Sequence, residues 1–493
     1  MRNDKLQLPA TFGARRIRAF AMLLLIVGSL PVSLVNAADI STEDNCTLAQ
    51  AIESANQDRA IGGCVAGSGA DHIELTADIM LTAELPAINS PIAIMGGGFA
   101  ISGDKRFRIF FVAEDGELTI DNLTLRDGQA TADARMCIDW GEDQWTTGGA
   151  ICNLGALSIS ESQFSGNGAE FGGAIASIDT LTISGGDFNG NAAYGGGAIF
   201  DWADGELTVM ASNFTDNTAR IPLALLEKIL ADMEDSAEES DVRIAVDPVF
   251  FVGHGGAIAS SLGGAVTITE TTFRSNLSDF GGGALLDHST TEIIDCQFIN
   301  NSSSNGSGGA IESRMGAVSV TGSDFSGNSA QLGGAVQSWG NFVVVDSLYN
   351  NNTAVRGGAI NTVGGMLSVT GSVFSDNSAT QSGGAIFNFN WAGGLFSATD
   401  SVFSGNSASQ SGGAIFGSGT VQISGSQFRR NAVGDLGGAI INEGTLTVTD
   451  SEFSENSAGI GGGGGIYNPP DNELSQDGNI YSDNRGGDCE GCD

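Results

Sequence analysis

The segment FSDNSATQSGGAIF, residues 374–387, is followed by the nearly identical FSGNSASQSGGAIF at residues 403–416. A glycine-rich loop that binds a phosphate is expected once in a chain, with a lysine and a serine or threonine after it and a helix beyond. This segment has neither feature, and it recurs along the chain. We therefore interpret it as a structural repeat.

Two motifs alternate through most of the sequence. In the first, an aromatic residue is followed three positions later by asparagine, and consecutive aromatics are 24 to 29 residues apart with one gap of 59. These aromatics are Phe164, Phe188, Phe214, Phe273, Phe298, Phe325, Tyr349, Phe374, Phe403, Phe428, Phe453 and Tyr481. The second motif, Gly-Gly-Ala followed by Ile, Leu or Val, lies between them and begins the regular repeats at about residue 148. A fixed period of this length is typical of a solenoid.

Apolar residues alternate with polar or small ones between the two motifs, as in Leu181/Ile183 and Leu367/Val369. A period of two bounded by Gly, Ser, Asn and Asp predicts short strands and turns. About 25 residues hold three such strands but no βαβ unit. The sequence therefore predicts an all-β fold, a right-handed parallel β-helix, with the handedness taken from the usual crossover preference.

Stacked coils would give each repeated residue a structural role. Neighbouring strands lie roughly 4.8 Å apart, so the aromatics would form a column in the interior and the asparagines a hydrogen-bonded ladder. The paired glycines would form a tight corner. Cys296 takes a slot that serine fills in most other repeats, two positions before the aromatic. We therefore expect a packed structural thiol there.

These motifs resemble the repeats of polymorphic outer-membrane proteins, bacterial surface β-helix proteins that include adhesins. The resemblance runs from about Gly148 to Asn484 and implies a role at the cell surface. The amino end, CTLAQAIESAN at residues 46–56 and GGCVAGSGADHIEL at 62–75, is similar to the CSLREA region that precedes β-helices in secreted bacterial proteins. Ala49, Gln50 and His72 depart from that pattern.

We divide the chain into four parts. Residues 1–37 have the basic start, apolar core and small residues of a signal peptide. Residues 38–70 form the CSLREA-like cap, in which Thr47 and Gln50 predict the capping box of a helix that plugs the solenoid. Residues 71–488 form the β-helix, interrupted by a helical insertion at 219–254. Residues 489–493 form a tail.

The formal net charge of −38 argues against partners that are nucleic acids or anionic membranes. The signal peptide predicts a secreted, extracellular protein or one associated with the outer membrane, with no integral membrane segment after the signal is removed. Seven cysteines indicate an oxidising compartment. We expect the disulfide pairs Cys46–Cys64, Cys137–Cys152 and Cys489–Cys492.

Alignment of the coils on their glycine pairs points to a candidate ligand site. Aromatic, charged and carboxylate residues would lie toward one side of the stack: Trp202, Trp339, Phe389, Asp201, Asp287, His288, Glu312 and Arg314. Aromatic rings among carboxylates suit sugar binding, and a carboxylate pair could cleave a glycoside. The alternative is scattered surface decoration. The insertion would either clamp a ligand over this side or pack on the outside.

Asp139, Glu142 and Asp143 lie inside the predicted Cys137–Cys152 loop. Several oxygen ligands suit calcium, the one cofactor that the sequence suggests, and a solvated acidic loop is the alternative.

Three functions remain open at this point. The resemblance implies a non-enzymatic, adhesin-like protein that binds an extracellular protein or glycan. The second is a polysaccharide lyase or glycoside hydrolase, since such enzymes also use β-helices. The third is a purely structural matrix component.

Overall fold

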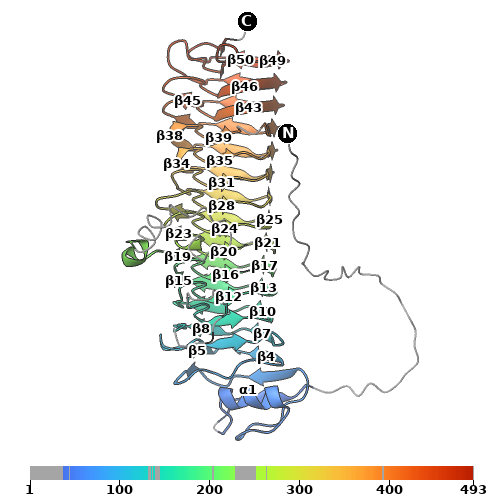
Figure 1. The fold of residues 1–493 in the computed structure, drawn as a ribbon. Coiled ribbons are helices and arrows are strands. Elements are labelled where there is room, and N and C mark those ends of the chain that lie inside the picture. Colours follow the sequence, from blue (N-terminus) through green and yellow to red (C-terminus); the bar gives the residue numbers. More distant parts are fainter. Residues whose placement is uncertain are drawn as a thin grey trace, which may run out of the picture. The chain divides into compact units, whose positions relative to one another are not determined.

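The computed structural model describes residues 37–43, 45–131, 135, 137–138, 145–202, 205–227, 251–261, 264–390 and 393–491. Their coils stack along one axis as a parallel β-helix, so the predicted fold class is confirmed (Figure 1). Residues 1–36 of the predicted signal peptide lie outside the described residues. No helix in the described part of the chain is long and apolar enough to cross a membrane.

The corner strands, which in the regular repeats follow the Gly-Gly corners, pair in parallel from coil to coil and face the viewer in Figure 1. They are β6 (Phe110–Val112), β9 (Ile151–Asn153), β12 (Ile175–Ser177), β16 (Ile199–Asp201), β20 (Ile258–Ser260), β24 (Leu285–Asp287), β28 (Ile311–Ser313), β31 (Val336–Ser338), β35 (Ile360–Val363), β39 (Ile386–Phe389), β48 (Ile466–Tyr467) and β51 (Cys489–Glu490).

The middle strands carry the alternating apolar pairs. They are β1 (Asp39–Ser41), β2 (Asp71–Glu74), β4 (Pro91–Met95), β7 (Glu117–Asp121), β10 (Ala156–Ser160), β13 (Leu181–Ser184), β17 (Glu206–Met210), β21 (Ala265–Thr269), β25 (Thr290–Ile294), β29 (Val318–Thr321), β32 (Phe342–Val345), β36 (Leu367–Thr370), β40 (Leu395–Thr399) and β49 (Leu474–Asp477). The long strands β43 (Ile415–Ser424) and β46 (Ile440–Thr449) each span a corner and a middle position.

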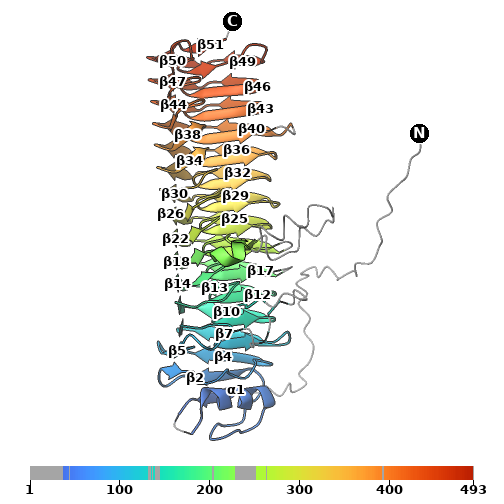
Figure 2. The ribbon, with the colours of Figure 1, turned by 60° about the vertical axis from the view of Figure 1, so that its left-hand side comes forward.

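The phenylalanine strands form a separate 15-stranded parallel sheet, seen along one edge in Figure 2. They are β3 (Ile79–Met80), β5 (Ala100–Ser102), β8 (Thr124–Arg126), β11 (Gln163–Ser165), β14 (Asp187–Asn189), β18 (Asn213–Thr215), β22 (Thr272–Arg274), β26 (Gln297–Ile299), β30 (Asp324–Ser326), β33 (Leu348–Asn350), β37 (Val373–Ser375), β41 (Val402–Ser404), β44 (Gln427–Arg429), β47 (Glu452–Ser454) and β50 (Ile480–Ser482).

Two small parallel sheets lie between the asparagine turns and the next glycine corners. One holds β15 (Ala192–Ala193), β19 (Thr218–Ala219), β23 (Leu277–Ser278) and β27 (Ser302–Ser303). The other holds β34 (Thr353–Arg356), β38 (Ser378–Ser382), β42 (Ser407–Ala408) and β45 (Ala432–Val433).

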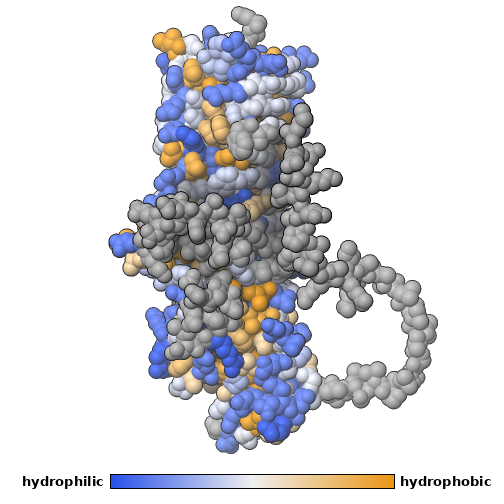
Figure 3. Space-filling view, viewed as in Figure 1, coloured by the Kyte–Doolittle hydropathy of each residue, from blue (hydrophilic) through white to orange (hydrophobic). Residues whose placement is uncertain are grey.

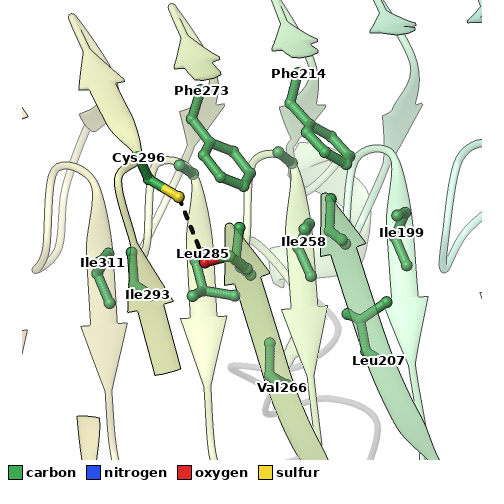
Figure 4. Packing of buried hydrophobic residues seen from close by; sticks show 14 of the residues in the cluster. Ile199, Leu207, Phe214, Ile258, Val266, Phe273, Leu285, Ile293, Cys296 and Ile311 are labelled. Atoms are coloured by element: carbon green, nitrogen blue, oxygen red, sulfur yellow. Dashed lines mark hydrogen bonds between the residues drawn. The ribbon is translucent and has the colours of Figure 1, made fainter. Parts of the chain in front are cut away.

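The repeated aromatics form the predicted internal column. From Phe164 to Tyr481, neighbouring ring centroids are 4.6 to 5.1 Å apart and the rings are nearly parallel. Figure 4 shows Phe214 and Phe273 in this column beside the aliphatic residues of the other two strand series. The spacing follows from the strand separation, so one aromatic per coil fills the interior without a gap.

The asparagines form the predicted ladder, and every ladder amide has several partners. Asn191 is typical: its Nδ2 donates to Asn217 Oδ1 at 3.0 Å and to Phe164 O at 2.9 Å. Its backbone N–H also donates to Asn217 Oδ1, at 3.0 Å. The ladder therefore satisfies polar groups that are buried at the turn.

Glycine is required at both positions of each corner, for two different physical reasons. The first has a left-handed backbone, as at Gly333 with φ of 61°. The second lies against the next coil: a Cβ added to Gly334 would lie 2.0 Å from Gly358 O. A side chain is therefore excluded at the first position by backbone conformation and at the second by space.

An alternation of aspartate and glycine separates negative charges at the turn after the middle strands. Asp346 adopts a left-handed backbone with φ of 47°, and Gly371 occupies the same place in the next coil. Asp346 Oδ1 lies 2.2 Å from where a Cβ of Gly371 would be, so the carboxylate folds over that glycine. Asp400 and Gly425 repeat the arrangement. From Asp295 to Gly478, carboxylates are thereby absent from adjacent coils at this turn, which limits the repulsion between them.

Helix α1 (Leu48–Gln57) lies at the amino-terminal end of the coils (Figure 1). The predicted Thr47–Gln50 capping box is present, and Leu48, Ile52 and Ala55 are buried as expected. Burial of this apolar face covers the end of the core.

The cysteines follow the sequence prediction where they are described. Cys46–Cys64 and Cys137–Cys152 are disulfides, and Cys489 is disulfide-bonded, while its predicted partner Cys492 lies outside the described residues. Cys296 is a buried free thiol pointing into the core (Figure 4). Burial raises the pKa of Cys296 to about 11, so it is not a reactive thiolate.

Candidate functional site

The residues of the predicted stripe lie in neighbouring columns at the ends of the corner strands. Asp201, Ser260, Asp287, Ser313 and Ser338 are paired in register from coil to coil. The residues that follow them in sequence are Trp202, Ser261, His288, Arg314 and Trp339, and the column continues through Val363, Phe389 and Ser418. The alignment on glycine pairs therefore identified residues that are adjacent in space.

The returning end of the insertion covers the amino-terminal half of this column. Phe251 packs edge-on against Trp202, with ring centroids 5.6 Å apart, and lies 5.0 Å from the ring of His288. Phe200 and Leu286 extend the same apolar cluster outside the coil wall. Trp202 is therefore largely a packing residue.

The insertion itself is described only in part. Residues 223–227 are helical, and residues 228–250 lie outside the described residues. Whether the insertion clamps a ligand stays a prediction. Its described end at Phe251 and Val252 packs onto the solenoid, as the alternative interpretation expected.

Asp201 and Asp287 are buried inside the coil, which corrects the expectation of acids exposed among aromatics. Strand alternation explains this, because each lies two residues after a core position and so faces inward. Ser260 Oγ donates to Asp201 Oδ2 at 3.4 Å. Ser289 donates to Asp287 Oδ1 through its N–H at 2.9 Å and its hydroxyl at 2.8 Å. Both belong to an internal polar column and not to an open site.

Burial raises the pKa of Asp201 to about 7, partly offset by the hydrogen bond from Ser260. Burial also raises the pKa of Asp287, against the hydrogen bonds from Ser289. In both cases the desolvation that raises the pKa outweighs the hydrogen-bond donors that lower it.

Asp201→Asn is expected to stabilise the protein above neutral pH. The unfolded chain releases this proton near the ordinary aspartate pKa of 3.8, whereas the folded chain holds it up to a pKa of about 7. Stability from this group is therefore present below about pH 4, is lost as the pH rises to about 7, and stays lost above it. We expect the substitution to raise the free energy of unfolding by roughly 2 to 4 kcal/mol near pH 8 and by little near pH 3.5. Denaturant titrations of both proteins at the two pH values measure this; an equal difference at both would contradict it.

Glu312 and Arg314 of the stripe form a cluster with His254, which lies at the end of the insertion; Glu312 and His254 are buried and Arg314 is partly buried. Arg314 Nε donates to Glu312 Oε1 at 3.1 Å, and Ser307 Oγ donates to the same oxygen at 3.1 Å. Glu312 Oε2 lies 3.9 Å from His254 Nε2. Gly281 leaves room for this carboxylate, since a Cβ there would lie 1.3 Å from Oε2.

The hydrogen bonds identify His254 as a neutral imidazole. Its Nδ1 lies 2.9 Å from Val252 O, and its Nε2 contacts the Arg314 guanidinium, which can only donate. Nδ1 therefore carries the proton. Burial and the nearby Arg314 charge lower the pKa of His254 well below its usual value, while burial raises the pKa of Glu312. Burial likewise lowers the pKa of His288 to about 4.

The carboxyl-terminal half of the stripe reaches the surface. Trp339 is 38% exposed and Phe389 42% exposed. Phe389 borders a groove of about 280 Å³ that the sequence did not predict, lined by Leu332, Arg356, Asn361, Val363, Gln381, Ser382, Phe387, Phe389, Gln410 and Phe416. Figure 3 shows hydrophobic side chains at the surface over this part of the corner strands, around β39 and β43.

The predicted calcium ligands Asp139, Glu142 and Asp143 all lie outside the described residues, so this site stays a prediction. Within the described ranges, no group of three His, Cys, Asp or Glu side chains is arranged to hold a metal ion.

Three segments, residues 371–388, 400–418 and 450–469, match the Chlamydia polymorphic membrane protein repeat. They contain the aromatic–asparagine turn, and two of them extend into a Gly-Gly-Ala corner. The resemblance stated from the sequence is thus supported for these repeats. No curated protein sequence matches the chain significantly.

Among solved structures, the chain is similar to a periplasmic alginate epimerase, with 9% sequence identity, a TM-score of 0.37 and 76% of each chain covered. A mutant of that enzyme matches with 10% identity, a TM-score of 0.37, 78% of this chain and 77% of that chain. Likeness at this level carries no inference about activity.

Proposed function

We propose that this protein is an exported, adhesin-like β-helix protein of a bacterial surface or its surroundings, which binds an extracellular protein or glycan without chemical turnover. The three repeat matches to a membrane-protein family are the observation that carries the surface assignment. The similarity of residues 46–75 to a CSLREA region and the predicted signal peptide agree with export.

Binding, as opposed to catalysis, is supported by the positions of the candidate catalytic groups. Asp201, Asp287 and Glu312 are at most 1% exposed. His254 already accepts a hydrogen bond from Arg314 and is buried. A general acid or base must reach its substrate, whereas these side chains are buried against other residues of the same chain. Trp339 and Phe389 are the stripe aromatics that are exposed.

The purified chain is expected to bind at least one member of a panel of matrix proteins and polysaccharides, with and without calcium, and to leave each polysaccharide intact. Retention on the immobilised panel measures binding, and a reducing-end assay on the same polysaccharides measures cleavage. Reducing ends that accumulate in proportion to the protein concentration would contradict the proposal and favour the glycoside-cleaving alternative.

A further inference from the structure

We propose that the groove between β35 and β43 is a binding site for a neutral oligosaccharide segment of a glycan. This inference rests on the proposed binding function and names its ligand class. The groove lies on the corner-strand face, directly beside the exposed end of the stripe.

Three aromatic rings form one wall. Phe387 and Phe416 stack with centroids 4.6 Å apart and an interplanar angle of 7°. Phe389 lies 6.5 Å from Phe387 at an angle of 18° and is the exposed member of the set. A partly exposed aromatic ring offers an apolar surface to the C–H faces of a sugar ring.

The floor contains a polar atom that has no protein partner. Asn361 is 1% exposed, and its Nδ2 donates to Gln337 Oε1. Its Oδ1 is buried and accepts no hydrogen bond. A buried acceptor of this kind costs about 1 to 3 kcal/mol when it is unsatisfied. The hydroxyl group of a bound sugar would supply the missing donor.

The remaining polar groups supply both donors and acceptors: the Arg356 guanidinium donates, and the carboxamides of Gln381 and Gln410 can donate and accept. Arg356 is held in place by a 2.9 Å hydrogen bond from its Nε to Gln381 Oε1, and its guanidinium carbon lies 5.5 Å from the Phe387 ring centroid. Gln410 lines the groove one coil beyond Gln381. Carboxamides and a guanidinium beside aromatic rings match the hydroxyl-rich edge and apolar face of a sugar.

The size of the groove and the net charge of the protein restrict the class of ligand. The groove volume of about 280 Å³ is near the lower limit of small-molecule sites, roughly 300–1,000 Å³, so it fits a short saccharide segment. A stable protein partner would need a contact area on the order of 1,000 Å². The net charge of −38 repels a polyanion, which favours a neutral glycan over an anionic one.

Affinity electrophoresis of the purified chain in gels containing galactomannan, a β-glucan, dextran or alginate tests this inference. We expect retardation by at least one neutral polymer, weaker or no retardation by alginate, and a dissociation constant raised about tenfold or more in Phe389→Ala and Arg356→Ala. Phe389→Tyr keeps the ring and should retain binding. Leu348→Ala is the matched control, because Leu348 is 48% exposed on the phenylalanine sheet and should change nothing.

The outcomes separate the two proposals. Equal binding by wild type, Phe389→Ala and Arg356→Ala would contradict the assignment of the groove as the binding site, while glycan binding itself would stand. Tighter binding of alginate than of every neutral polymer would overturn the ligand class. Binding of a matrix protein but of no polysaccharide would overturn the glycan inference and leave the adhesin-like function standing. No binding to any panel member would overturn both.

Discussion

Asn328→Ala is expected to lower the free energy of unfolding by about 4 kcal/mol, because it removes four hydrogen bonds of a buried side chain and leaves the backbone N–H of Asn301 without its acceptor. Asn328 Oδ1 accepts from the backbone N–H of Asn301 at 2.9 Å and from its Nδ2 at 3.1 Å. Asn328 Nδ2 donates to Phe298 O at 2.8 Å. Alanine offers none of these partners, and the site is closed to water.

Denaturant unfolding followed by circular dichroism measures the loss, and amide hydrogen exchange locates it. Each coil contacts mainly its neighbours, so we expect faster exchange in the coils around residues 298–352 before it spreads. Asn341→Ala is the control: its side chain is exposed and accepts one hydrogen bond, from Met366 N. A cost equal to that of the control would contradict the ladder's role.

Gly334→Ala is expected to cost about 3 kcal/mol or more and to reduce the yield of folded protein. The added Cβ would lie 2.0 Å from Gly358 O and 2.7 Å from the backbone of Thr353, so one coil must move away from the next. Gly364→Ala is the matched control, since Gly364 has a φ of 71° but open space around it. It should cost about 1 kcal/mol from backbone strain alone. Thermal unfolding of both variants measures the difference, and equal effects would show that close coil contact is not the cause.

The repeat made most of the fold predictable from the sequence. Each repeat carries the same residue types at the same positions. The phenylalanine column, the asparagine ladder and the glycine corner could therefore be assigned without coordinates. The Thr47–Gln50 capping box was equally readable, because it depends on residues three positions apart. Cys296 could be interpreted only after its slot in the repeat was known.

The candidate site was less predictable, for two physical reasons. Successive side chains of the corner strands point alternately inward and outward, which places Asp201 and Asp287 inside the coil. Alignment on the glycine pairs does not distinguish the inward positions from the outward ones. The insertion's return to the stripe at Phe251 depends on packing between residues far apart in sequence. The groove could have been suspected from Phe387 and Phe416, because the preceding coils carry polar residues at the same outward position.

The most direct test of the proposed binding face is hydroxyl-radical footprinting of the wild-type chain with and without a panel member that binds. The exposed side chains Trp339 and Phe389 report on the corner-strand face, and Leu348 and Met210 report on the other two strand series. The proposal predicts that the ligand lowers the oxidation of Phe389 and Trp339 and leaves Leu348 and Met210 unchanged. Protection of Leu348 or Met210, with Phe389 and Trp339 oxidised as in the free protein, would contradict it.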